Sequence, residues 1–205
     1  MIVVAPRNPP ATLALVGVAA ALFVAIRMLD LDSLARALLI SEYTQHARPP
    51  LPEIRAGEWW RLITPAFLHF GLFHAVFNLL WVWELGRVIE SRHGAAALLA
   101  LSAIVAVVSN LAQFFVAGPL FGGMSGVLYG CFGYVLVQGR FNPAFDARLT
   151  PPIIYLLLGW FALGWTRVLE MVGVHIANTA HTAGLLCGIA LGLIVLVARR
   201  VMRVR

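Results

Sequence analysis

The sequence predicts an all-α polytopic membrane protein, a bundle of six transmembrane helices. The chain of 205 residues is 61% hydrophobic and 12% charged, whereas ordinary soluble domains are about 45–50% apolar. Its mean hydropathy is +0.88. The apolar residues gather in repeated runs of about 20, and each run is long enough to cross a ~30 Å hydrocarbon core.

We expect the six spans at residues 11–29, 72–91, 96–116, 125–139, 152–168 and 176–198. The first apolar run is too long and too poor in charge at its start for a cleaved signal peptide. The expected organisation is a short cytoplasmic N-terminus (1–10), one transmembrane domain (11–198) and a basic cytoplasmic tail (199–205), with no soluble domain.

The arginines predict the orientation. An even number of spans puts both termini on one side, and that side would carry Arg7, Arg87, Arg92, Arg140, Arg148, Arg199, Arg200, Arg203 and Arg205. The opposite side would carry Arg36, Arg48, Arg55, Arg61 and Arg167. The positive-inside bias therefore predicts cytoplasmic termini. The net charge of +6 does not indicate a nucleic-acid partner, because the arginines form no dense stripe.

The connection between the first two spans, residues 30–71, is too long to be a structureless loop in a compact domain. It contains LARALLI, which has a helical period, and then GEWWRLITPAFLHF. Trp59, Trp60 and Arg61 suit the headgroup region, so we expect a membrane-associated first outer loop. These three residues are either an interfacial anchor or a direct aid to substrate access.

The fourth span is too short. Only 14 residues run from Ser125 to Gln138 before Gly139-Arg140, and as a helix they rise about 21 Å. The helix would then begin below the outer surface, and the preceding AGPLFGGM would enter the membrane as non-helical backbone. Such backbone is tolerated where it lines a water-filled cavity, which predicts a hydrated pocket at Ser125. Alternatively, Ser125 is only an N-cap after a glycine turn.

One face of the last span carries His181, Gly184, Gly188 and Gly192 at helical spacing. The short span carries glycines too, at 126, 130 and 133, so the two helices can pack closely through small residues. A histidine at the top of one helix would then meet a serine at the top of the other. His181 is either a base for Ser125 or a hydrogen-bonding packing residue.

A third polar cluster begins the second span. His74 and Asn78 share a helical face, and His69 precedes them. Imidazole and carboxamide are neutral donors that could stabilise an oxyanion, although polar contacts between helices remain an alternative. A metal site is disfavoured because there is no HExxH motif and the carboxylates lie mostly in loops. In the same span we expect Glu84 to pair with Arg87.

Three motifs, HFGLFHAVFN, FGGMSGVLYG and ANTAHTAGLLCG, together with the loop element WWR, resemble the rhomboid family of intramembrane serine proteases, in particular its bacterial GlpG-like branch with a six-helix core. The resemblance covers about residues 57–192. It implies an enzyme of the bacterial inner membrane that cleaves transmembrane protein substrates and needs no cofactor or metal.

The resemblance also implies roles for single residues. Ser125 would be the nucleophile and His181 its general base, in a dyad without a carboxylate. His74 and Asn78, with the backbone N–H of Ser125, would form the oxyanion hole. A non-catalytic membrane binder and a small transporter are the alternatives, and the intact Ser125 and His181 argue against the first.

Supporting roles follow from the same resemblance. Tyr129 would pack against the catalytic imidazole, and Gly123 would make the turn before the nucleophile. His69 and Asn178 would support the cavity and its hydrogen bonds, and Gln113 would line the site. Trp60-Arg61 matches the loop motif of the family, and Glu90 matches a structural carboxylate.

Overall fold

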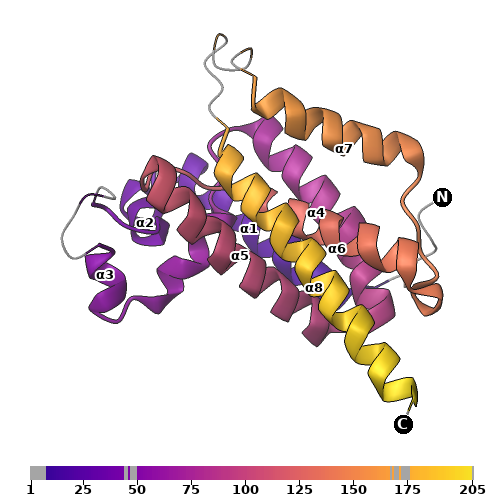
Figure 1. Cartoon of the computed structure of the whole chain (residues 1–205). Helices are drawn as coiled ribbons and strands as arrows, with labels where there is room; N and C mark the ends of the chain where they lie inside the picture. The colour runs from indigo at the N-terminus through magenta and orange to yellow at the C-terminus, as the bar shows by residue number, and fades with distance from the viewer. Residues whose placement is uncertain are drawn as a thin grey trace.

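The chain folds as a bundle of helices, seen in a computed structural model that describes residues 8–43, 46, 50–166, 168, 171 and 176–204. The described residues contain no β-strand. The longer helices lie side by side, and the short helices of the first loop gather at one end of the bundle (Figure 1). The elements, in chain order, are α1 (Pro10–Met28), α2 (Asp32–Leu38), α3 (Pro52–Arg55), η1 (Trp59–Leu62), η2 (Thr64–Phe67), α4 (Leu72–His93), α5 (Ala95–Ala117), α6 (Ser125–Phe141), η3 (Pro143–Phe145), α7 (Pro151–Gly164) and α8 (Asn178–Val204).

The long apolar segments are helices that begin and end within two residues of the predicted bounds, with two exceptions. The helix α7 ends at Gly164, four residues before its predicted end, and α8 continues to Val204, six residues past its predicted end. By length and hydropathy, four helices of the described chain can cross a membrane: α1, α4, α5 and α8. The helix α7 is apolar but has only 14 residues. Its predicted extension to residue 168 includes Arg167, which lies outside the described residues, as do Arg7, Arg48, Arg205 and the side chain of Arg203.

The helix α6 is the centre of the bundle. Of its 17 residues, 14 are buried, so it is enclosed on all sides rather than on one stripe. It begins at Ser125, as predicted, but it continues past Gly139-Arg140 to Phe141. The predicted end at residue 139 was two residues too early, because side-chain contacts hold the last turn. Gln138 donates to the carbonyl of Gly192 at 2.6 Å and accepts from Asn142 at 2.7 Å. At about 26 Å, α6 is still shorter than the ~30 Å core.

The start of α1 is fixed by Glu90 of α4. Pro10 has no backbone N–H, and the next two free N–H groups, of Ala11 and Thr12, donate to the Glu90 carboxylate at 2.9 and 2.8 Å. The Thr12 hydroxyl donates to it at 2.6 Å. A buried carboxylate thus satisfies the orphan donors of a helix N-terminus.

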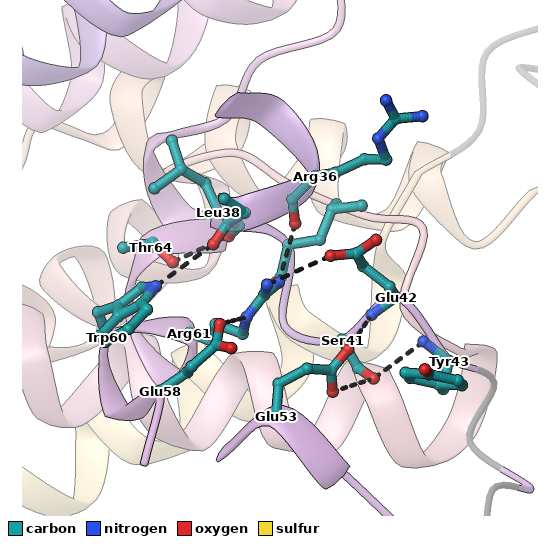
Figure 2. Close-up of polar contacts among 12 residues, drawn as sticks. Arg36, Leu38, Ser41, Glu42, Tyr43, Glu53, Glu58, Trp60, Arg61 and Thr64 are labelled. Atoms are coloured by element: carbon teal, nitrogen blue, oxygen red, sulfur yellow. Dashed lines mark hydrogen bonds and ion pairs between the residues drawn. The ribbon is translucent and has the colours of Figure 1, made fainter. Parts of the chain in front are cut away.

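The described part of the first loop is built around Arg61 (Figure 2). The guanidinium is buried and donates to the carbonyls of Arg36 and Leu39 at 2.8 and 2.9 Å. It also pairs with Glu58 at 2.6 Å and with Glu42 at 3.4 Å. These contacts join the C-terminal end of α2 to η1. Trp59 and Trp60 remain exposed.

The predicted pair inside α4 is present. Arg87 donates to Glu84 at 2.6 Å, three residues apart on the helix. Such a pair offsets the cost that a carboxylate would have in a membrane-spanning helix.

Candidate active site

Ser125 is the first residue of α6, so its backbone N–H has no acceptor within the helix. The chain reaches it through a tight turn at Gly123, whose φ of +121° is disfavoured for residues with a side chain. The Gly123 N–H donates to the carbonyl of Pro65 at 3.0 Å. The first turn of α6 thus presents unpaired donors, and the positive end of the helix dipole, beside the serine hydroxyl.

Ser125 and His181 lie at the same level of two tightly packed helices. A Cβ atom on Gly184 would overlap the carbonyl oxygen of Gly126, and one on Gly188 would overlap that of Gly130. Gly126 directly follows the serine, and Gly184 lies one turn after the histidine. The backbones of α6 and α8 therefore touch at the turn that carries both side chains.

Both side chains are buried, with 8% of Ser125 and 6% of His181 exposed. Among the hydrogen bonds of the described residues there is none between the two.

Tyr129 lies against the histidine. Its ring centroid is 4.9 Å from that of His181, with 39° between the ring planes. Its hydroxyl donates to the carbonyl of Leu157 in α7 at 3.1 Å. One residue of the central helix therefore contacts the imidazole and also attaches α7.

The first turn of α8 is held by two amide side chains. Gln113 of α5 accepts from the backbone N–H of Ala180, next to His181, at 3.0 Å. Asn178 donates to the carbonyl of Gly164 at the end of α7 at 2.6 Å. Gln113 was predicted to line the site; in the structure it binds the backbone that carries the histidine.

His74 and Asn78 lie against the turn that precedes the serine. A Cβ atom on Gly123 would be 2.6 Å from Cε1 of His74 and 3.6 Å from Nδ2 of Asn78. The backbone just before Ser125 therefore lies against both side chains. Nδ2 of Asn78 donates to the carbonyl of His74 at 2.9 Å, and an amide nitrogen has a second hydrogen to offer.

His69 supports the same turn. Its Nε2 accepts from the backbone N–H of Met124 at 3.4 Å, and its Nδ1 lies 3.3 Å from the carbonyl of Phe67. These two contacts assign the proton to Nδ1. Burial, and to a smaller extent His74 at 5.2 Å between ring centroids, lowers the pKa of His69 to about 4. The ring is therefore neutral at pH 7.

Two further polar residues of α5 were missed by the sequence analysis. Ser109 packs on Gly126, where an added Cβ atom would be 2.6 Å from its hydroxyl. Asn110 donates to the carbonyl of Leu62 in the first loop at 2.9 Å. Both lie near Gln113 in the sequence of an apolar helix. This group of polar residues was the sequence signal that could have identified them.

The arrangement suits nucleophilic acyl transfer. A serine hydroxyl, a buried imidazole on the facing helix and neutral donors beside the serine backbone are the groups that such chemistry needs. Across the described residues, no three His, Cys, Asp or Glu side chains gather as metal ligands do.

The chain is also similar in sequence to known proteins. Residues 56–198 match the family model described as the Rhomboid domain. Over 137 residues the chain is 41% identical to "Rhomboid protease GlpG" of Klebsiella pneumoniae. The aligned region covers 67% of this chain and 49% of the relative. Over 145 residues it is 39% identical to "Rhomboid protease GlpG" of Salmonella newport, covering 71% and 51%. The chain thus spans about half the length of these relatives.

Proposed function

The chain belongs to the rhomboid family, and on this premise we propose that it is a serine endopeptidase that hydrolyses peptide bonds in or near transmembrane segments of other membrane proteins. In the proposal α1, α4, α5, α6, α7 and α8 form six spans of a bacterial inner membrane protein. Both termini are cytoplasmic, in agreement with the arginine distribution. The cavity at Ser125 opens to the opposite side.

The reaction is acyl transfer. His181 takes the proton of the Ser125 hydroxyl as its oxygen attacks the carbonyl carbon, and the carbonyl oxygen becomes an oxyanion. His74, Asn78 and the backbone N–H of Ser125 donate to that oxyanion. His181 then protonates the leaving amine, and a water molecule hydrolyses the acyl-enzyme by the same steps.

The backbone contact of α6 with α8 is the observation that carries the proposal. It supports a dyad because Ser125 and His181 stand on the touching turns of the two helices. Without an aspartate to orient the imidazole, the Tyr129 ring and the Gln113 contact to the start of α8 restrict it.

The substrate class follows from the chemistry. A helix hides its carbonyls in hydrogen bonds, so the substrate must unwind locally before attack. We therefore expect cleavage near the extracytoplasmic face, with a small residue before the scissile bond and a helix-weakening Gly or Pro nearby.

Cleavage of a transmembrane reporter protein in liposomes tests this function. We expect defined products from the wild type and none from Ser125→Ala or His181→Ala. Thermal unfolding of both variants in detergent serves as the control for folding. Equal cleavage by all three proteins would refute the protease function.

A further inference from the structure

A groove of about 360 Å³ lies at the other end of α6 from Ser125. It is formed by the last turns of α6, the start of α7 with the loop before it, and the middle of α8. Its apolar wall includes Leu136, Leu149, Ile154 and Ile189. The wall begins ten residues after Ser125, about 15 Å along the helix, so the groove is separate from the candidate active site.

Two arginines border this groove, Arg140 at the end of α6 and Arg148 in the following loop. In the described part of the chain neither has an ion-pair partner, whereas Arg87 and Arg92 pair with Glu84 and Asp146. The Arg140 guanidinium lies over the Phe141 ring at 5.4 Å. Among the described residues that line the groove there is no carboxylate. The border of the groove therefore carries positive charge that no carboxylate there compensates.

The outer side of α7 extends the apolar surface. Tyr155, Leu156 and Leu158 are exposed there, as residues that face lipid are in a membrane protein. Water in an apolar groove beside such a surface is unfavourable. An acyl chain therefore suits the groove, and an anionic group suits its border.

We propose that the groove binds one anionic glycerophospholipid from the leaflet at the C-terminal end of α8. One acyl chain lies between Leu136 and Ile154, and the headgroup phosphate accepts from the guanidiniums of Arg140 and Arg148. Guanidinium matches phosphate in charge and in bidentate geometry. With cytoplasmic termini this leaflet is the inner one, where basic pockets between helices meet anionic headgroups.

Native mass spectrometry of the delipidated full chain tests the binding, with dioleoylphosphatidylglycerol or dioleoylphosphatidylcholine added in neutral detergent. All proteins carry Ser125→Ala, so the result does not depend on proteolysis. We expect the adduct with phosphatidylglycerol to be more abundant than the adduct with phosphatidylcholine. Arg140→Gln and Arg148→Gln should each weaken it about fivefold, from ~1 kcal/mol per surface arginine. Arg200→Gln, on an exposed arginine outside the groove, should leave it unchanged.

A second pair of variants tests the acyl-chain position. Ile154→Trp fills the groove without changing charge and should weaken the adduct, whereas Leu156→Trp, on the exposed side of α7, should not. Thermal unfolding without lipid checks that each variant is folded. If Ile154→Trp does not fold, the arginine variants still test the proposal. Equal binding of both lipids, equal loss with Arg200→Gln, or a dimer without lipid adducts would overturn the proposal.

Discussion

At the scale of single residues, Tyr129 has two separable contacts. Its ring lies on the His181 imidazole, and its hydroxyl holds the Leu157 carbonyl of α7. The ring contact restricts the imidazole, for which the described residues include no carboxylate partner. The hydroxyl contact concerns the attachment of α7 alone.

Substitution at position 129 should separate these contacts. Tyr129→Phe keeps the ring and loses one interhelical hydrogen bond, so we expect about 0.6–1 kcal/mol less stability and nearly full activity. Tyr129→Ala also frees the imidazole, and we expect a loss of about 10²-fold in kcat. Reporter cleavage and thermal unfolding measure both effects. Equal activity of the two variants would show that the ring does not position His181.

His69 predicts a pH dependence of stability. Its pKa is about 4 in the folded protein and about 6.5 in an unfolded chain. Between these values the unfolded chain binds a proton that the folded chain does not, so stability falls as the pH falls from about 6.5 to about 4. Thermal unfolding across this range should show a shallower slope for His69→Gln. A slope of His69→Gln equal to that of the wild type across this range would contradict the prediction.

At the scale of elements, the α1 N-terminus depends on one carboxylate of α4. Glu90→Gln keeps the size of the side chain but removes the negative charge of the carboxylate, which accepts hydrogen bonds from the backbone N–H groups of Ala11 and Thr12. We expect a loss of about 2 kcal/mol in unfolding free energy. Glu84→Gln, on the same helix, breaks only the partly exposed pair with Arg87 and should cost less. Chemical denaturation in mild detergent compares them, and the opposite order would refute this role of Glu90.

The contact of α6 with α8 predicts a second effect at this scale. Gly188→Ala would place a methyl group on the Gly130 carbonyl and separate the helices, two turns away from His181. We expect loss of stability and of cleavage together. Gly159→Ala in α7 meets no atom within 4 Å and should be neutral or slightly stabilising. Unchanged cleavage by Gly188→Ala would show that the dyad does not depend on this packing.

At the scale of the whole molecule, the hydrophobic runs predicted the bundle because apolar segments of this length have few other structures in a membrane. The glycine face of α8 predicted its packing on α6, and the short run after Gly123 predicted where α6 begins. These signals are local in sequence. They can therefore be recognised without knowledge of the tertiary structure.

Contacts between distant residues could not be predicted in this way. Arg61 binds carbonyls 22 and 25 residues before it, and backbone carbonyls carry no sequence signal. The end of α6 depends on Gln138 and Gly192, 54 residues apart. The Gln113 contact with the start of α8 spans 67 residues. The supporting contacts of the site thus required the structure, whereas Ser125 and His181 could be proposed from the sequence alone.

The account rests on Ser125 as a nucleophile activated by His181. Labelling with a fluorophosphonate probe in detergent, read by mass spectrometry of the modified peptide, tests this claim most directly. We predict phosphonylation at Ser125 in the wild type, much slower labelling in His181→Ala and none in Ser125→Ala. Labelling of Ser125 at the same rate with and without His181, or no labelling of a folded wild type, would contradict the account.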